Sequence, residues 1–552
     1  MYILGITAPI SWNSAACIIK DGELIAAAEE ERFTRIKHAP RIPPVLAIKY
    51  CLRQAGINMN EIDHIAVGFS SPLTYAIKNL IDETKEFNFN RYIQQIGSVF
   101  EYKIIMYKLK VAFKELDPDI AHKKFTFISH HMSHAASAFR VSGFDEANII
   151  TLDGSGEDDS GMLAVGVGND MRLLNKIKIK DSLGVLYSNA TDLLGFVRHS
   201  QEGKIMGLAA YGKIMPELEE VILKEKDGMY YLKKRYDKYL WKKFGPRRKE
   251  NEELSQVHKD IACTVQDIVE KAGMMAAKKL DSESHSSNLC LSGGVVLNCD
   301  MNAKILNLPF IKDIFIQPGA HDASSALGAA YELYAKLGGK NKFKMSHAYW
   351  GPQYSNEDIL QVLEESKAKY TYYENVEEQT ARIIADGNII GWFQGRMEWG
   401  PRALGNRSIL AHPAKDGMKD KVNREVKHRE MWRPFAPSIL EEDASQYVEN
   451  YHPSPFMLLT FTVKPEMKKC LSQAMHVDNT VRLQTVNKET NPRFHELITQ
   501  FKKITNISGL LNTSFNDRGE PLVESPKDAL RTFYSTGLDY LVLGNYIIGK
   551  NK

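Results

Sequence analysis

The chain has 552 residues, which is too long for a single hydrophobic core and predicts two or more domains. Its composition, 43% hydrophobic and 25% charged, is typical of a globular protein, and its formal net charge of +3 predicts no general affinity for nucleic acid or membranes. Six scattered cysteines form no CxxC pair, which argues against a zinc ribbon or a disulfide framework and fits a reducing cytoplasm.

The first residues, MYILGITAPISW, lack the basic start and the long apolar core of a signal peptide. No uninterrupted apolar run of about 18 residues occurs, so the sequence predicts no membrane-spanning helix. We therefore expect a cytoplasmic protein that has neither nucleic acid nor a membrane among its partners.

The N-terminal segment predicts strands followed by a helix. Residues 2–7 predict a strand, and the apolar runs on either side of Lys20-Asp21-Gly22 predict a hairpin, because Asp-Gly favours a tight β-turn. Residues 43–57 predict a helix, and residues 64–69 predict another strand.

Two later segments have a related pattern. Residues 148–168 predict an apolar strand, an Asp-Gly turn and a hairpin, and residues 288–306 predict a strand, a glycine turn and a helix. This alternation indicates an α/β protein, and the recurrence of the hairpin and the glycine turn suggests two related lobes.

The sequence changes character at residues 336–352, where Gly338, Gly339 and polar neighbours look like a linker and Ser355 looks like the cap of a new helix. We therefore divide the chain into domains 1–345 and 346–552. The most basic stretch, residues 229–250, is interpreted as a solvated helical excursion with aromatic anchors; a surface for RNA or an anionic substrate is the alternative.

The stretch HHMSHAASAF contains His130 and His134, which project from one face if the segment is helical. The pair alone could hold a metal or simply begin a small-residue helix. Asp153 at the end of an apolar strand and Asp322 among small residues strengthen the metal hypothesis, because two imidazoles and two carboxylates suit a divalent ion such as iron or zinc.

A second candidate site is the glycine turn of LSGGVVLN, where Ser292, Gly293 and Gly294 lie between a strand and a helix. Amides in such a turn can hold a phosphate, although a tight turn needs glycine in any case. The sequence contains no GxxxxGK[ST] phosphate loop and no GxSxG nucleophile elbow.

The C-terminal domain carries basic residues embedded among Gly, Pro, Ala and Trp, an arrangement that is poorly explained as a solvated face. Guanidinium groups beside Asn and Ser suit phosphates and carboxylates, and a structural salt-bridge network is the alternative. These residues are Arg396, Arg402, Arg407, Lys427, Arg429, Arg433, Arg482 and Arg518.

Eight blocks occur in order along the chain: EEERFTRIKH, HHMSHAASAF, LDGSGE, GKIMGLAAYG, LSGGVVLNCDMN, GRMEWGPRALGNRSIL, WRPFAPSI and LNTSFNDRGEPLV. Together they resemble the O-carbamoyltransferases that include nodulation protein U and the antibiotic-tailoring carbamoyltransferases. The resemblance covers nearly the whole chain.

The resemblance implies an N-terminal domain of the actin-like ATPase fold, a duplicated RNase H-like fold, and a C-terminal domain of the YrdC-like α/β fold. It also implies that the C-terminal domain makes carbamoyl adenylate from carbamoyl phosphate and ATP with Mg²⁺. The intermediate would pass through an enclosed space to the N-terminal domain, where an acceptor hydroxyl on a small molecule or sugar attacks it. A homodimer is also plausible by resemblance.

The family's functional residues transfer to this sequence by position. The implied metal ligands are His130, His134, Asp153 and Asp322, and the implied catalytic residues on the ATP and carbamate side are Lys427, Arg433 and Arg402. Carbamoyl phosphate is implied to bind Arg482, Arg518, Asn512 and Ser514. The implied nucleotide-binding residues are Lys204, Gly154, Ser292, Gly293, Gly294 and Asn298.

One position departs from the family pattern. Many relatives have His-Asp just before the small residues of the first hairpin, whereas this chain has Trp12-Asn13. Either another residue activates the acceptor hydroxyl, with His38 and His131 as candidates, or Trp12 stacks on a different acceptor. The acceptor cannot be read from the sequence. A tRNA threonylcarbamoyl-transferase-like enzyme, which shares both domain types, is the alternative function.

Overall fold

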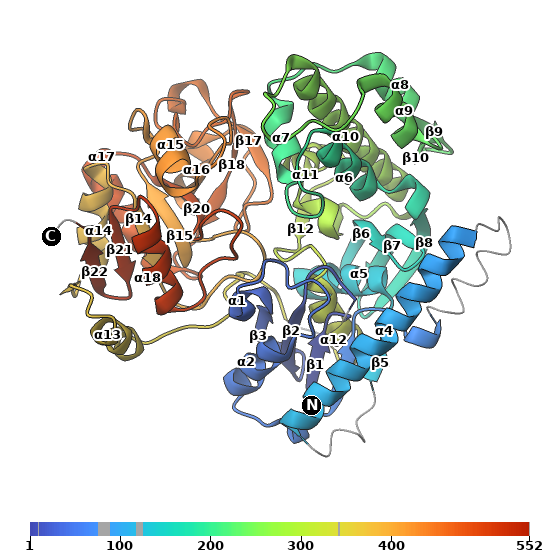
Figure 1. Cartoon of the computed structure of the whole chain (residues 1–552), viewed down its shortest axis with the longest axis horizontal. Coiled ribbons are helices and arrows are strands. Elements are labelled where there is room, and N and C mark those ends of the chain that lie inside the picture. Colours follow the sequence, from blue (N-terminus) through green and yellow to red (C-terminus); the bar gives the residue numbers. More distant parts are fainter. Residues whose placement is uncertain (9, 75–88, 118–124, 341–342, 551–552) are drawn as a thin grey trace. The chain divides into compact units, whose positions relative to one another are not determined.

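The computed structural model describes residues 1–552 except 9, 75–88, 118–124, 341–342 and 551–552 (Figure 1). It divides into two compact units, Met1–Met345 and Ser346–Lys552. This division falls within the stretch 336–352, where the sequence changes character. Each unit is described separately below.

The first sheet of the first unit has five strands in the order β3-β2-β1-β4-β5. Strands β1 to β3 form an antiparallel meander, whereas β1/β4 and β4/β5 are parallel. Asp21 and Gly22 join β2 to β3 with φ values of 51° and 88°, the positive values that a type I′ turn requires. The strands are β1 (Tyr2–Ile6), β2 (Ala15–Lys20), β3 (Glu23–Glu29), β4 (His64–Val67) and β5 (Phe125–Phe127).

The second sheet repeats this topology, in the order β8-β7-β6-β11-β12. Strands β6 to β8 form an antiparallel meander, and β6/β11 and β11/β12 are parallel. The expectation of two related lobes is therefore confirmed in strand order and direction. The strands are β6 (Glu146–Gly156), β7 (Asp159–Val167), β8 (Asp170–Lys178), β11 (Asn288–Ser292) and β12 (Asp313–Ile316).

Two helices of small residues, α5 (His130–Ser142) and α12 (Ser324–Lys336), pack closely against each other. A Cβ on Gly328 of α12 would lie 1.6 Å from the carbonyl oxygen of Ser133 in α5. On the neighbouring sheet, a Cβ on Gly5 of β1 would lie 2.1 Å from the carbonyl oxygen of Ala326. The small residues therefore allow α12 to approach both α5 and β1 at backbone distance.

The other helices of the first unit are α1 (Glu31–Thr34), α2 (Val45–Ala55), α4 (Phe89–Leu116), α6 (Leu183–Leu193), α7 (Gly203–Ala209), α8 (Pro216–Ile222), α9 (Tyr236–Phe244), α10 (Gln256–Ser284) and α11 (Cys299–Leu306). The basic stretch 229–250 is only partly helical. It begins as β10 (Met229–Leu232), which pairs with β9 (Leu223–Lys226), and continues into α9. The interpretation of a purely helical excursion was therefore wrong in its first part.

The second unit contains a mixed eight-stranded sheet in the order β13-β22-β21-β14-β15-β20-β16-β19. A small antiparallel pair, β17 (Thr460–Thr462) and β18 (Thr480–Arg482), accompanies it. The sheet strands are β13 (Thr371–Tyr372), β14 (Ile390–Phe393), β15 (Arg407–Ala411), β16 (Ala436–Leu440), β19 (Gln484–Val486), β20 (Gly509–Ser514), β21 (Tyr540–Leu543) and β22 (Tyr546–Gly549).

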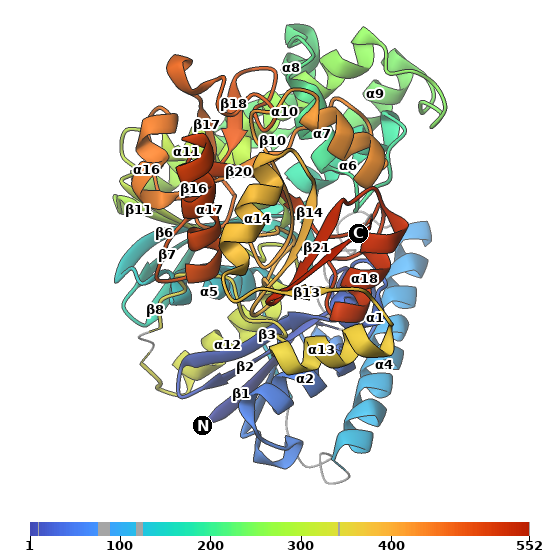
Figure 2. The same ribbon diagram turned by 90° about the vertical axis from the view of Figure 1, so that its left-hand side faces the viewer.

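Helices cover both faces of this sheet (Figure 2). Ile390 and Trp392 of β14 pack with α14 (Val376–Ala385) and α17 (Pro492–Thr505), whereas Phe393 packs on the opposite face with α13 (Asn356–Glu365) and α18 (Pro526–Ser535). Alternation along a strand sends successive side chains into the two cores. Ser355 caps α13 by accepting the N–H of Asp358 at 3.1 Å, as predicted.

Within the described ranges, no helix combines the length and the apolar character needed to cross a bilayer.

Candidate metal centre and arginine cluster

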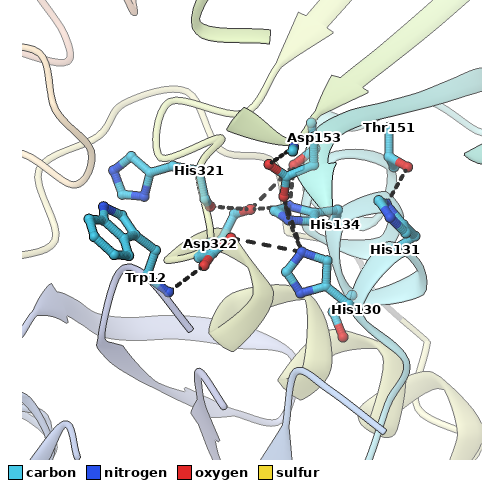
Figure 3. A network of polar contacts seen from close by, with 12 residues as sticks. Trp12, His130, His131, His134, Thr151, Asp153, His321 and Asp322 are labelled. Atoms are coloured by element: carbon cyan, nitrogen blue, oxygen red, sulfur yellow. Dashed lines mark hydrogen bonds and ion pairs between the residues drawn. The ribbon is translucent and has the colours of Figure 1, made fainter. Parts of the chain in front are cut away.

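Four side chains of the first unit converge on one point (Figure 3). His130 and His134, one turn apart on α5, direct their Nε2 atoms toward each other at 3.0 Å. Oδ2 of Asp153 lies 3.1 Å from the first of these nitrogens and 3.2 Å from the second. Oδ1 of Asp322, just before α12, lies 3.8 Å from Nε2 of His130.

The donor set fits a divalent metal. Ligands at adjacent positions around one ion, each about 2.1 Å from it, lie roughly 3.0–3.4 Å from one another. Three of the four separations given above lie in that range, and Asp322 is a few tenths of an ångström outside it. Two imidazoles with two carboxylates suit iron or zinc better than calcium.

The hydrogen bonds around His134 orient its ring. Nδ1 of His134 lies 2.9 Å from Oγ of Ser324 and 3.2 Å from Oγ of Ser292, so the other nitrogen, Nε2, faces the cluster. Gly156 packs directly against the other imidazole, since a Cβ there would lie 2.1 Å from Cδ2 of His130. Such partners typically fix the orientation of metal-binding histidines.

The electrostatics of the cluster favour a positive charge. Burial lowers the pKa of His130, but the carboxylates of Asp153 and Asp322 more than offset this and raise it to about 9. Burial raises the pKa of Asp153, but hydrogen bonds from both histidines hold it well below its usual range. The two carboxylates thus require a cation here, either a proton on an imidazole or a metal ion.

The sequence suggested that Asp153 ends its strand, and the structure shows that it does not. Strand β6 continues to Gly156, with a shift of register between Leu152 and Gly156 opposite β7. A bulge of this kind re-aims side chains next to functional sites. The sequence pattern located the residue correctly but not the local backbone.

The two histidines considered as acceptor bases differ in their surroundings. His131 uses both ring nitrogens, 3.1 Å from Oγ1 of Thr151 and 3.0 Å from the carbonyl oxygen of Asp159, and burial lowers its pKa to about 3. His38 has Nδ1 3.0 Å from the amide nitrogen of Asn13, while its Nε2 is buried and has no hydrogen-bonding partner among the described residues. Both ring nitrogens of His131 are therefore occupied by hydrogen bonds within the fold, which disfavours this histidine as the base.

Trp12 lies beside the metal cluster on the side opposite His131 (Figure 3). Its backbone N–H donates to Oδ2 of Asp322 at 2.7 Å, and its indole N–H donates to the carbonyl oxygen of His199 at 3.0 Å. The indole is 40% exposed, and its ring centroid lies 6.4 Å from that of His38. A large aromatic face is thus held open to solvent next to a candidate metal ligand.

The residues expected to bind nucleotide in the first unit differ from one another in how accessible they are to a ligand. The hydroxyl of Ser292 is fully buried against His134, so it supports the metal centre and is not open to a phosphate. Asn298 caps α11 through the N–H of Met301 and pairs with Gln266. Its expected nucleotide contact therefore competes with structural bonds.

Gly293 has φ 99°, and a Cβ there would lie 2.2 Å from the carbonyl oxygen of Leu152, so the turn requires glycine for packing. A Cβ on Gly154 would meet no atom within 4 Å, and a Cβ on Gly294 would lie 3.0 Å from Oδ1 of Asp153. Lys204 is buried on α7, with Nζ 4.7 Å from the centroid of the Phe196 ring. These glycines and this lysine stay candidates.

In the second unit, arginines from three segments gather. Burial and the neighbouring charges of Arg433 and Arg482 lower the pKa of Arg429. Burial lowers the pKa of Arg433, Glu430 partly offsets this, and Arg482 and Arg518 lower it further. The side chains of Arg433 and Arg482 form no hydrogen bond or ion pair with other described residues, and Nε of Arg482 is buried. Guanidinium groups gathered in this way suit an anion such as a phosphate.

Other predicted residues support this region. Nζ of Lys427 lies 2.9 Å from the carbonyl oxygen of Ser514 and 2.6 Å from Oδ1 of Asn516. The amide of Asn512 is buried in a network with Ser438 and Gln484, so its expected contact with carbamoyl phosphate competes with core bonds.

Two of the noted arginines are structural. Arg407 is fully buried over the Phe393 ring, and its guanidinium donates to backbone carbonyls, among them those of Gln394 and Pro352. Arg396 donates to the carbonyls of Trp350 and Gly351. These contacts with backbone carbonyl groups hold both side chains in place within the fold.

Sequence reasoning missed Glu398. Its Oε1 accepts three backbone N–H groups, from Leu404, Asn406 and Arg407, at 2.8 to 3.0 Å. The carboxylate thereby folds the loop that carries Arg402. The available signal was an acidic residue two positions before a Gly-Pro-Arg sequence.

A duplicated α/β unit with a His-His-Asp-Asp cluster, together with an α/β unit bearing an arginine cluster, defines a two-unit enzyme. Family models described as "Carbamoyltransferase N-terminus" and "Carbamoyltransferase C-terminus" match residues 2–331 and 381–550. The chain belongs to the carbamoyltransferase family and is a carbamoyltransferase.

The relatives extend along most of the chain. Nodulation protein NolNO of Sinorhizobium fredii is 38% identical over 98% of this chain and 79% of its own length. The 3'-hydroxymethylcephem-O-carbamoyltransferase of Amycolatopsis lactamdurans is 29% identical over 76% of this chain and 80% of its own. The ROK hexokinase of Thermus thermophilus aligns at TM-score 0.30 and 14% identity over 61% of this chain and all of its own, a likeness too low to carry an argument.

Proposed function

We propose that the protein is an ATP-dependent O-carbamoyltransferase that activates carbamoyl phosphate in its second unit and transfers the carbamoyl group in its first. The observation that carries the proposal is the arginine cluster of the second unit, where the charges of Arg482 and Arg518 act on Arg433 and where neither Arg433 nor Arg482 forms a side-chain ion pair with a described residue. Carbamoyl phosphate, with one phosphate group, and ATP, with three, would supply negative charge to this cluster. The cephem relative is named for O-carbamoyl transfer.

In the first half-reaction, Arg482 and Arg518 bind carbamoyl phosphate, with Ser514 and Asn512 nearby. Lys427, Arg433 and Arg402 bind the carbamate and the phosphates of ATP with Mg²⁺. Water first cleaves carbamoyl phosphate to carbamate and phosphate. A carbamate oxygen then attacks the α-phosphate of ATP, which releases pyrophosphate and leaves carbamoyl adenylate. Negative charge develops on phosphoryl oxygens during both displacements, and fixed guanidinium and ammonium groups stabilise it without reorganisation.

In the second half-reaction, the nucleotide of carbamoyl adenylate lies against the glycine turns of the first unit, near Gly154, Gly293 and Gly294. His130, His134, Asp153 and Asp322 hold a divalent metal, iron or alternatively zinc. When bound, this ion supplies Lewis-acid stabilisation of the departing phosphate. The donor set and its spacing support this assignment.

The acceptor is a small molecule or sugar that presents a hydroxyl group. The exposed indole of Trp12 stacks on the acceptor. His38 does not serve as the base, because its Nδ1 accepts from the side-chain amide of Asn13 and its buried Nε2 therefore carries the ring proton. The attacking hydroxyl forms a C–O bond to the carbamoyl carbon as the bond to AMP breaks, and its proton is released to water.

The fold assignment forms part of the proposal. An actin-like ATPase fold for the first unit is supported by two five-stranded sheets with one strand order. A YrdC-like fold for the second unit rests on the resemblance alone.

The proposal is tested by pyrophosphate release from purified protein supplied with ATP and carbamoyl phosphate, each omitted in turn. Release that requires both substrates supports the adenylate step. Release with ATP alone, or none from folded and metal-loaded protein in the presence or absence of a pool of hydroxyl compounds, contradicts it.

A further inference from the structure

Helix α4 (Phe89–Leu116) has apolar side chains on two opposite faces. Tyr102, Met106, Leu109 and Phe113 are buried in the core of the first unit. A second set is exposed: Phe100 by 65%, Ile104 by 53%, Tyr107 by 69% and Val111 by 40%. At 3.6 residues per turn, the exposed set lies about 180° around the helix axis from the buried set. We call the exposed set the α4 ridge.

The α4 ridge is continuous and outward-facing. Its members are spaced by four, three and four residues, so they form one stripe along about three turns. In Figures 1 and 2, α4 runs along the outside of the first unit. Exposed apolar side chains are common singly, but a stripe of four, two of them aromatic, marks a binding surface.

Lysines flank the α4 ridge. Lys103, Lys110 and Lys114 lie on one side of the stripe and are exposed. The other side carries Lys108, which is also exposed, together with the sequence positions of Glu101 and Glu115. None of these lysines pairs with a carboxylate among the described residues; Nζ of Lys110 lies 6.0 Å from the centroid of the Phe125 ring. The net charge of +3 predicts no affinity for membranes, but positive charge is concentrated on this helix.

We propose that the α4 ridge binds the surface of a membrane that contains anionic lipids. Phe100, Ile104, Tyr107 and Val111 would enter the boundary between headgroups and acyl chains, and the lysines would lie at the phosphate level, where their stems can extend past apolar groups. A bilayer offers an apolar interior beneath a negatively charged surface, the complement of an apolar stripe bordered by Lys103, Lys110 and Lys114.

Other occupants fit less well. A second copy of the chain, packed ridge to ridge, would bring unpaired lysines against lysines. A specific protein interface needs about 20–30 residues a side, far more than the four of the ridge. A fluid bilayer needs no shape complementarity, so a narrow ridge is sufficient.

The test is flotation of the full-length protein with vesicles of phosphatidylcholine alone and of phosphatidylcholine mixed with phosphatidylglycerol. We expect binding to the mixed vesicles at low salt, with loss at high salt because the attraction is screened. Ile104→Ser combined with Tyr107→Ser, and separately Lys103→Glu combined with Lys108→Glu, should each weaken binding roughly tenfold or more. Circular dichroism and thermal unfolding check that these variants fold.

The matched control combines Val257→Ser and Tyr534→Ser, which remove apolar side chains that are 49% and 57% exposed elsewhere. The control should bind as the unaltered protein does. The proposal is overturned if the protein does not bind the mixed vesicles at low salt, or if it binds neutral vesicles equally well. It is also overturned if the control variant loses as much binding as the ridge variants. A dimer that the ridge substitutions dissociate, measured by sedimentation, would also overturn it, since the ridge would then join two copies.

Discussion

Nε2 of His130 and Nε2 of His134 face each other at 3.0 Å, with Oδ2 of Asp153 within 3.2 Å of both. Two N–H groups cannot point at each other at that separation, so at most one of these nitrogens carries a proton. A single metal ion would remove the conflict by accepting both lone pairs together with the carboxylate.

Substitution His134→Ala should abolish metal binding, because one of four ligands and the link to Ser292 and Ser324 are lost together. His131→Asn is the matched control, since His131 lies on the same helix but uses both nitrogens elsewhere. We expect the control to retain metal while losing some thermal stability. Elemental analysis of the purified variants decides, and full metal content in His134→Ala would contradict the assignment.

Substitution Arg482→Gln should stabilise the free protein slightly, because it removes a positive charge close to Arg429 and Arg433. Inorganic phosphate should stabilise the unaltered protein and so raise its unfolding temperature. At a phosphate concentration of a hundred times the dissociation constant, the added free energy of unfolding is about 2.7 kcal/mol. The variant should lose most of that response. An unchanged phosphate response, measured by thermal unfolding, would place the anion elsewhere.

Stability at acid pH should depend on His38. Burial lowers the pKa of His38 to about 4 from its ordinary 6.5, so between these values the unfolded chain binds the proton and the folded chain does not. Stability should therefore fall as pH decreases from 6.5 to 4, by about 3 kcal/mol from this group. His38→Asn, which tolerates the positive φ of 66°, should remove that part of the decline in denaturant titrations. An unchanged acid decline in the variant would be inconsistent with a buried neutral His38.

Substitution Gly328→Ala should destabilise the first unit by about 1–3 kcal/mol and weaken metal binding, because the added methyl meets the backbone of α5 at Ser133. Gly203→Ala is the control, since a Cβ at that first residue of α7 has no neighbour within 4 Å. The control should be neutral or stabilising by up to about 1 kcal/mol. Equal melting temperatures for the two variants would refute the close packing of α5 and α12.

Periodicity and turn chemistry predicted much of the fold. The Asp21-Gly22 hairpin, the helix at Val45–Ala55 and the Ser355 cap follow from local rules that depend on neighbouring residues alone. Helix α4 was not predicted. Its apolar residues occupy two opposite faces, so they do not form the single stripe on which helix recognition depends.

The candidate sites were less accessible to sequence reasoning. Spacing could pair His130 with His134, and the positions of Asp153 and Asp322 beside small residues added them to the metal hypothesis, which the family resemblance then strengthened. Sequence also could not show that Ser292 supports His134, or that His131 is saturated by hydrogen bonds while His38 is not. These roles depend on which atoms face each other after folding, which residue type and spacing do not encode.

The most direct test of the two-step account compares pyrophosphate release by the unaltered protein, Arg482→Gln and His134→Ala, each given ATP and carbamoyl phosphate. The account predicts that Arg482→Gln loses release, because the donor is no longer held, while His134→Ala retains it and loses only metal and transfer. Loss of release in His134→Ala with the fold intact, or full release in Arg482→Gln, would contradict the division of the two half-reactions between the units.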